Sequence, residues 1–153
     1  MRGKITNIGD AYASCGRYRL ILLWFHASAA AENLEFCKKA NEAQNAGDHD
    51  SAILHYSQCI DRGDLTTKNL FLAFYDRGNA YLVKLQFTKA IADYDQATRL
   101  DPTHAYAFNN RGNALTRIGQ LDRAIQNYDQ AIQLAPTDDV PLFNRGNAYS
   151  VKR

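Results

Sequence analysis

A six-residue phrase occurs three times in this chain of 153 residues. It reads DRGNAY at 76–81, NRGNAL at 110–115 and NRGNAY at 144–149, so that its glycines are 34 residues apart each time. A fixed period of this length is typical of repeat architectures, in which each unit buries its apolar face against its neighbours. The phrase therefore predicts a repeat fold.

The composition predicts a folded domain that does not bind nucleic acid. The chain is 46% hydrophobic and 22% charged, a balance typical of globular proteins. Four of its 18 basic residues lie in residues 1–31, but only one of its 16 acidic residues does. Residues 32–153 therefore carry 14 basic and 15 acidic residues. This balance offers no electrostatic footprint for nucleic acid.

Apolar residues on both sides of the phrase recur at helical spacing, and Gly or Pro separates successive stripes. This pattern predicts antiparallel pairs of helices. Between the first and second units the period lengthens, since Tyr56 and Tyr94 are 38 residues apart. The four extra residues lie within 64–69, where Thr66 or Thr67 can cap a helix that begins early. We therefore expect the first helix of the second unit to be about one turn longer than its counterparts.

Residues 71–138 show an aromatic residue four positions before the Gly, a Gly-x-x-aromatic step, an Ala-x-x-x-Tyr-x-x-Ala pattern and a closing Pro. In these features they resemble the tetratricopeptide repeat. The resemblance implies an all-α fold, a right-handed superhelix of antiparallel helix hairpins with about three and a half repeats. The implied domain spans 32–153, with repeats at 33–64, 71–104 and 105–138 and a half repeat at 139–153.

The chain departs from the family pattern at four positions. Arginine stands where the family usually has Leu, at Arg77, Arg111 and Arg145, and Leu85 stands where Gly is common. The arginines recur at the period of the repeat, as do aspartates on the second helices. We expect the arginines either to reach Asp95 and Asp129, two of these aspartates, or to lie on a solvated surface.

The other recurring residues have expected packing roles. The glycines of the phrase allow the two helices of a hairpin to approach closely, with Ala90 and Ala124 as the small partners opposite. Tyr94 and Tyr128 are expected to fill the space between adjacent units. Replacing either tyrosine with Ala is expected to cost about 3–5 kcal/mol, as for other buried aromatic residues.

The amino-terminal segment follows the order of a secretory signal peptide. Two arginines precede an apolar run at 20–25, and small residues follow. We expect 1–31 to be a leader that is cleaved after Ala29 or Ala31, which places the protein in the periplasm or outside the cell. The leader, the Cys-x-x-x-Gly-Asp-Leu stretch at 59–65 and the repeated phrase are also similar to exported repeat proteins of Gram-negative bacteria. The alternative is a buried helix that caps the first repeat.

Two cysteines are predicted to face each other. In an antiparallel helix pair that closes through Gly47, residues whose numbers sum to about 96 lie opposite, as Cys37 and Cys59 do. In an oxidising compartment such a pair forms a disulfide. It would stabilise the first repeat by about 2–4 kcal/mol. The alternative is a pair of buried free thiols.

No residue pattern indicates catalysis or a metal site. The sequence contains no Gly-rich phosphate loop, no cluster of His and Cys and no strand–turn–helix setting for a nucleophile. His49 and His55 are six residues apart, whereas residues on one helix face are three or four apart. We therefore expect no enzymatic activity, no cofactor and no metal ion.

The candidate site is a groove along the first helices of the repeats, which line the concave side of such a superhelix. Asn recurs at one place on four successive first helices, and its amide can both donate to and accept from a peptide backbone. In this family such asparagines often line the ligand groove, although Asn beside the Gly is also frequent whatever the ligand. The predicted groove residues are Asn41, Tyr75, Asn79, Tyr106, Asn109, Asn113, Arg117, Phe143 and Asn147.

The predicted function is a non-catalytic scaffold that binds a protein or peptide partner in the cell envelope, without nucleic acid or a stable membrane anchor. Family members that bind chaperone tails grip a terminal carboxylate with basic residues at positions held here by Tyr75, Asn109 and Phe143, so that specificity is not indicated. The alternative is a repeat segment of a larger enzyme or regulator, truncated at residue 153. Self-association through the C-terminal half repeat is a third option.

Overall fold

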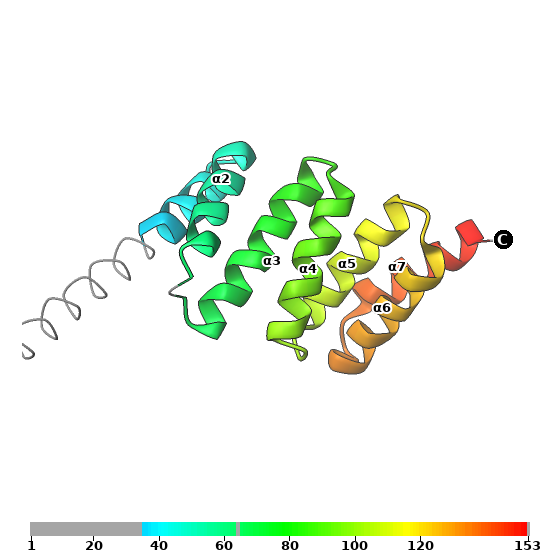
Figure 1. The fold of residues 1–153 in the computed structure, drawn as a ribbon. Coiled ribbons are helices and arrows are strands. Elements are labelled where there is room, and N and C mark those ends of the chain that lie inside the picture. Colours follow the sequence, from blue (N-terminus) through cyan, green and yellow to red (C-terminus); the bar gives the residue numbers. More distant parts are fainter. Residues whose placement is uncertain (1–34, 64, 153) are drawn as a thin grey trace, which may run out of the picture.

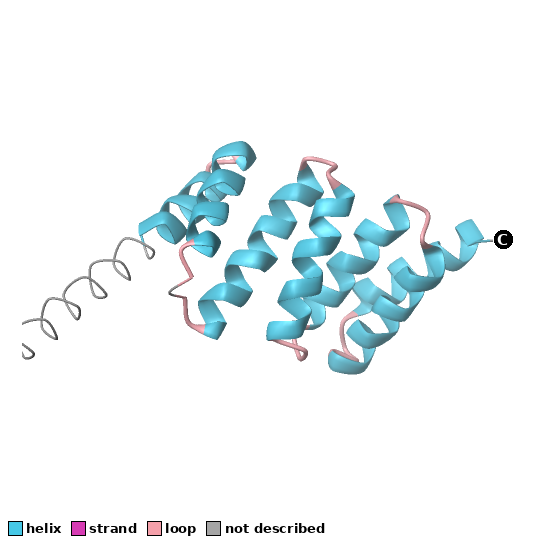
Figure 2. Cartoon of the chain, in the orientation of Figure 1, coloured by secondary structure: helices cyan, strands magenta, loops and turns pink. Residues whose placement is uncertain are grey.

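The computed structural model describes residues 35–63 and 65–152, and every regular element in these ranges is a helix (Figures 1 and 2). Residues 35–45 are helical and precede the helices α2 (His49–Asp61), α3 (Thr67–Val83), α4 (Phe87–Leu100), α5 (Ala105–Arg117), α6 (Leu121–Leu134) and α7 (Asp139–Lys152). This array confirms the all-α fold predicted from the repeated phrase. The expected leader at 1–31 lies outside the described residues.

Local sequence signals mark the starts of α2 and α3 and the end of α4. Asp48 caps α2 and Thr66 caps α3, each side chain accepting a hydrogen bond from a backbone N–H three residues later. α3 has 17 residues against 13 in α5, which confirms the expected extra turn. α4 ends at Leu100, just before Pro102, which cannot continue a helix.

The first helices of successive hairpins form the inner side of the array. α3 contacts α5 and α5 contacts α7, in addition to the contacts between consecutive helices. The second helices α2, α4 and α6 have no comparable contacts with one another in the described ranges. The first helices therefore lie closer together than the second helices, which makes their side the concave one.

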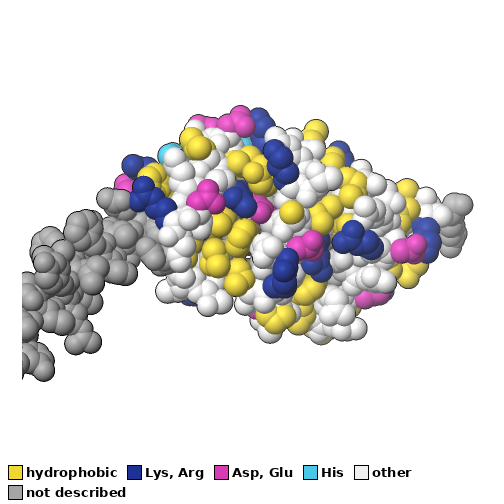
Figure 3. Space-filling view, viewed as in Figure 1, with side chains coloured by type: hydrophobic (Ala, Val, Ile, Leu, Met, Phe, Trp, Pro, Cys, Tyr) yellow, Lys and Arg dark blue, Asp and Glu magenta, His cyan; other side chains and the backbone are white. Residues whose placement is uncertain are grey.

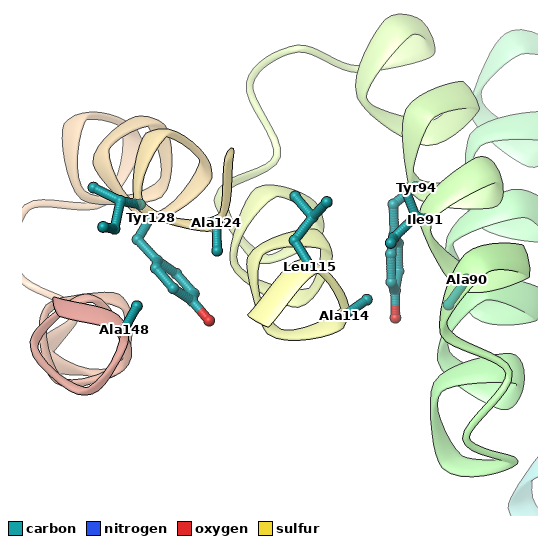
Figure 4. Close-up of a cluster of buried hydrophobic side chains, with 9 residues drawn as sticks. Ala90, Ile91, Tyr94, Ala114, Leu115, Ala124, Tyr128 and Ala148 are labelled. Carbon is teal, nitrogen blue, oxygen red and sulfur yellow. The ribbon is translucent and has the colours of Figure 1, made fainter. Parts of the chain in front are cut away.

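Two tyrosines connect neighbouring repeats in the main core cluster. Tyr94 of α4 lies beside Ala114 of α5, and Tyr128 of α6 lies beside Ala148 of α7 (Figure 4). Both rings are almost fully buried. Their position agrees with the expectation that tyrosines fill the space between adjacent units.

The glycines of the phrase make room for these tyrosines. A Cβ on Gly78 would lie 2.9 Å from a ring carbon of Tyr94, and one on Gly112 would lie 2.6 Å from a ring carbon of Tyr128. The close partner of each glycine is thus a tyrosine ring, not the expected alanine at 90 or 124. The reason is that the ring, four residues after that alanine, extends back across the hairpin. A Cβ on Gly146 would lie more than 4 Å from the side chains of the described residues.

The recurring arginines bind polar side chains of the second helices, and Arg111 bridges two of these helices. Arg111 donates to Asp95 on α4 at 2.7 Å and to Asn127 on α6 at 2.6 Å. Arg145 donates to Asp129 on α6 at 2.5 Å. These two ion pairs confirm the expected partners.

For Arg77 the expected partner is wrong. Its guanidinium binds both carboxylate oxygens of Asp93 on α4, at 2.7 and 2.8 Å, and donates to Ser57 on α2 at 3.0 Å. The physical reason is that Ser57 occupies on α2 the place that Asp95 occupies on α4. The bridge is therefore kept, but the carboxylate comes from the arginine's own hairpin.

The first hairpin has a smaller core of its own. Cys37 and Cys59 form a disulfide with their Cα atoms 5.4 Å apart, joining segment 35–45 to α2. Ala40, Ala52 and Tyr56 are buried in the same cluster. This cluster also includes Ala73 of α3, which connects the first hairpin to the rest of the array.

Candidate functional site

Three of the recurring asparagines are oriented by tyrosines of the second helices. The hydroxyl of each tyrosine donates to the Oδ1 atom of the asparagine on the facing helix. The pairs are Tyr56–Asn41 at 2.6 Å, Tyr94–Asn79 at 2.8 Å and Tyr128–Asn113 at 2.9 Å. Burial raises the pKa of all three tyrosines, so that they remain protonated donors. Because the amide oxygen accepts from a phenol, the NH2 group of each asparagine is left to donate elsewhere.

Amide hydrogen bonds also join successive first helices, and we call them the amide chain. Asn110 of α5 donates to Oδ1 of Asn79 at 3.0 Å and to the Tyr75 hydroxyl at 3.4 Å, both on α3. Asn144 of α7 donates to Oδ1 of Asn109 on α5 at 3.0 Å. Asn109 is only 5% exposed, so this predicted groove residue lies beneath the surface.

A cavity of about 500 Å³ lies near the C-terminal end of the concave side, and we call it the C-terminal cavity. Three predicted groove residues line it: Asn113, Arg117 and Asn147. The Arg117 guanidinium lies 5.3 Å from the centre of the Phe87 ring, which also lines the cavity. Among the described residues that line this cavity none is a carboxylate, so its polar character comes from amides, hydroxyls and one cation.

A second cavity, of about 540 Å³, lies between the first hairpin and α3, and we call it the N-terminal cavity. Asn41 is the predicted groove residue that lines it. Sequence reasoning missed Asp76, a half-buried carboxylate in the same lining. A signal was present, because position 76 holds Asp where the two later copies of the phrase begin with Asn.

The remaining predicted residues lie outside both cavities. Tyr75 and Asn79 lie between them, within the amide chain. Tyr106 and Phe143 are exposed, at 58% and 70%, and neither lines a described cavity. The structure thus brings together Asn113, Arg117 and Asn147 but separates them from the other predicted positions.

The described residues contain no group of three or more His, Cys, Asp and Glu side chains that could hold a metal ion. Within the same ranges, no helix combines the length and the apolar character needed to cross a membrane. Basic and acidic side chains are interspersed over the face shown in Figure 3. This mixture agrees with the near-neutral charge of residues 32–153.

Residues 75–139 match a family model described as tetratricopeptide repeat. No curated protein matches the chain. Three similar solved structures are the first TPR of Spaghetti (RPAP3) bound to the HSP90 peptide SRMEEVD, the second TPR domain of human RPAP3 in complex with the HSP70 peptide SGPTIEEVD, and the TPR domain of Arabidopsis OM64.

In the same order, their TM-scores are 0.71, 0.69 and 0.70, and their sequence identities are 21%, 24% and 18%. The alignments cover 80%, 81% and 80% of this chain and 94%, 98% and 98% of those chains. At these identities the likeness concerns the fold. Residues 75–139 are therefore tetratricopeptide repeats, and the chain has the fold of such domains.

Proposed function

We propose that the chain is a non-catalytic scaffold whose concave side binds an extended segment of a partner protein. The C-terminal cavity is the proposed centre of contact, where Asn113 and Asn147 donate to peptide carbonyl groups and Arg117 supplies a positive charge. Two of the similar structures are TPR domains in complex with peptides, which supports the same use of the fold here.

The observation that carries this proposal is the pairing of tyrosine and asparagine. A buried tyrosine holds the Asn113 amide by its oxygen, which fixes the side chain before any ligand arrives. A donor that is already oriented loses less conformational entropy on binding than a free one. Asn147 continues the same row on α7 and is exposed.

A capture experiment tests the proposal. The full chain is immobilised and exposed to an extract of native cells, beside an Asn113→Ala plus Asn147→Ala variant and a Gln126→Ala control. Gln126 is exposed on the second helix α6, away from the cavity lining. We expect proteins retained by the wild type and the control to be lost from the double variant. Equal retention by a double variant with a normal melting transition would contradict the proposal.

We also propose that α7 mediates self-association through its open side. A Cβ on Gly146 would meet no other described residue within 4 Å, whereas one on Gly78 or Gly112 would meet a tyrosine ring. Val140, Tyr149 and Val151 are exposed on the same helix. The prediction is a concentration-dependent dimer in sedimentation velocity that Val151→Asp converts to a monomer. A wild-type chain that stays monomeric at high concentration would refute it.

We further propose that the protein acts in the cell envelope. Two observations support export: the charged, apolar and small-residue order of 1–31, and the disulfide between Cys37 and Cys59. The mass of the protein purified from native cells tests this. Cleavage after Ala29 or Ala31 is the expected result, and an intact Met1 would exclude it.

A further inference from the structure

Position 76 interrupts the amide chain. Its counterparts on the next first helices, Asn110 and Asn144, each donate to the preceding first helix. An ionised aspartate can only accept, so Asp76 cannot make the equivalent bond to segment 35–45. Within the described residues no such bond joins α3 to that segment.

The N-terminal cavity lies at this interruption. One wall comes from segment 35–45, including Lys38 and Asn41, and the other comes from α3, including Leu72 and Asp76. Its volume of about 540 Å³ is in the range of ligand-binding sites in proteins. Tyr56 and Ala73 add apolar surface between the two walls. The cavity therefore combines an apolar lining with one half-buried carboxylate.

The Asp76 carboxylate has no cationic partner among the described residues. Burial raises its pKa to about 6, and a side-chain hydrogen bond with Asn79 opposes this rise. The two other charged residues of the lining have partners elsewhere, since Lys38 pairs with Glu42 at 3.9 Å and Glu35 pairs with Lys39 at 3.8 Å. A desolvated carboxylate without a counter-charge is unfavourable, and a cation in the cavity would relieve that cost.

We propose that the N-terminal cavity binds a basic side chain, lysine or arginine, of the partner peptide, with Asp76 as the acceptor of its charged hydrogen bonds. Leu72, Ala73 and Tyr56 would pack against the aliphatic stem of that side chain, as apolar surfaces do for the stems of other lysines and arginines. The cavity lies between first helices, so the inference rests on the proposed binding of a peptide along the concave side.

Three peptides test this inference in the labelled full chain, followed by amide chemical shifts at neutral pH and low salt. Each is an acetylated, amidated pentapeptide of alanine with lysine, norleucine or glutamate at its centre. We expect the lysine peptide to shift Leu72 and Asp76 and to bind about tenfold or more tightly than the norleucine peptide, as a charge-assisted hydrogen bond allows. The glutamate peptide should bind no better than norleucine.

Two variants assign the preference to one carboxylate. Asp76→Asn places at this position the residue that positions 110 and 144 already carry, so the fold should be retained. It should reduce the affinity for the lysine peptide to that for the norleucine peptide. Glu35→Gln, in the same lining, should change the affinity less than about twofold because Glu35 is exposed and paired. An unchanged lysine preference in Asp76→Asn would overturn the inference.

The shifts also separate this inference from the proposed function. Peptides that shift Asn113 and Asn147 without any preference for lysine would refute the basic-side-chain site and support peptide binding on the concave side. A lysine preference that depends on Asp76, without shifts at the C-terminal cavity, would support the inference and contradict the proposed centre of contact.

Discussion

Two junctions between neighbouring first helices can be compared: the one between α3 and α5, and the one between the first hairpin and α3. Each contains a copy of the repeated phrase, which begins with Asn110 at the former and with Asp76 at the latter. At the former, Asn110 donates across to α3 and the first helices are joined. At the latter, Asp76 donates nothing and a cavity lies between the helices. The comparison teaches that the first residue of the phrase decides whether an amide joins neighbouring first helices or a carboxylate lines a cavity between them.

The largest expected effect concerns the ion pairs of two recurring arginines, one largely buried and one more exposed. Arg77→Ala would leave Asp93 buried without a partner, since the two side chains are only 15% and 7% exposed. We expect a loss of about 3–5 kcal/mol in the free energy of unfolding, measured by urea denaturation. Arg145→Ala is the matched control, because Arg145 and Asp129 are 33% and 41% exposed. It should cost about 0–1 kcal/mol, and equal losses for both variants would contradict the account.

The disulfide lies in the first hairpin, which forms one wall of the N-terminal cavity and is not joined to α3 by the amide chain. Replacing both Cys37 and Cys59 with Ser should lower the free energy of unfolding by about 2–4 kcal/mol, because a loop of 22 residues is no longer closed in the unfolded chain. The wild type in reductant should melt at the temperature of the double variant. Identical melting of the wild type with and without reductant would show that the bond does not support the hairpin.

The glycines of the phrase distinguish a covered copy from an open one. Gly112→Ala should destabilise the chain by about 1–3 kcal/mol, since the new Cβ would overlap the Tyr128 ring. Gly146→Ala should be neutral or stabilising by about 0.5–1 kcal/mol, because alanine is the better helix former and the space is open. Thermal melting of the two variants measures the difference between these stability changes. Equal melting temperatures would contradict the claim that Gly112 is needed to make room for the Tyr128 ring.

The charge of Asp76 should make stability depend on pH. In the folded chain its pKa rises from 3.8 to about 6, so the proton is bound more tightly than in the unfolded chain. This contribution to stability is present below about pH 4 and is lost as pH rises through about 6. The shift corresponds to at most about 3 kcal/mol, and solvent screening of the partly exposed carboxylate reduces this to roughly 1–2 kcal/mol.

Asp76→Asn should therefore be more stable than the wild type at pH 7 and should lose this pH dependence. Denaturation at several pH values measures the free energy of unfolding of both proteins. The same dependence of this free energy on pH in the two proteins would contradict the account. The titratable groups around Asp76 are Glu35 and Lys38 of segment 35–45, Tyr56 of α2, Tyr75 of α3 and Tyr94 of α4. The tyrosines do not titrate in this range because burial raises their pKa values.

The smallest expected effect concerns the turn between α3 and α4. Leu85 has a φ of 57°, in the left-handed region, where Gly47 and Gly119 hold the equivalent places with φ of 77° and 76°. Leu85→Gly should stabilise the chain by about 1 kcal/mol, since a side chain is disfavoured there. Gly119→Ala should destabilise it by a similar amount. A destabilised Leu85→Gly variant would mean that the exposed leucine contributes more by contact than it costs in strain.

Much of the fold could be predicted because it depends on spacing. The period of the glycines, the cap at Thr66 and the opposition of Cys37 and Cys59 all follow from position along helices, and the structure contains each of them. The close approach of Gly78 to the Tyr94 ring was not predicted. Helical spacing shows which residues share a face, but it does not show how far a side chain extends toward the other helix of the hairpin.

The site was less predictable, because it depends on which hydrogen-bond partner lies next to each polar side chain in the folded chain. The row of asparagines was visible in the sequence, but the tyrosines that hold them were not, nor was the burial of Asn109. Arg77 was assigned the wrong aspartate because Ser57 replaces the acidic residue on α2. Asp76 could have been identified by comparing the first residues of the three copies of the phrase.

Hydrogen exchange of the backbone amides tests the comparison of the two junctions most directly. We expect amides of α2 to exchange through openings of lower free energy than those of α4 and α6, because fewer bonds join the first hairpin to the array. Asp76→Asn should raise the protection of α2 and leave that of α6 unchanged, because an amide at position 76 can again donate to the preceding first helix. Equal protection of α2 in the wild type and in this variant would contradict the account.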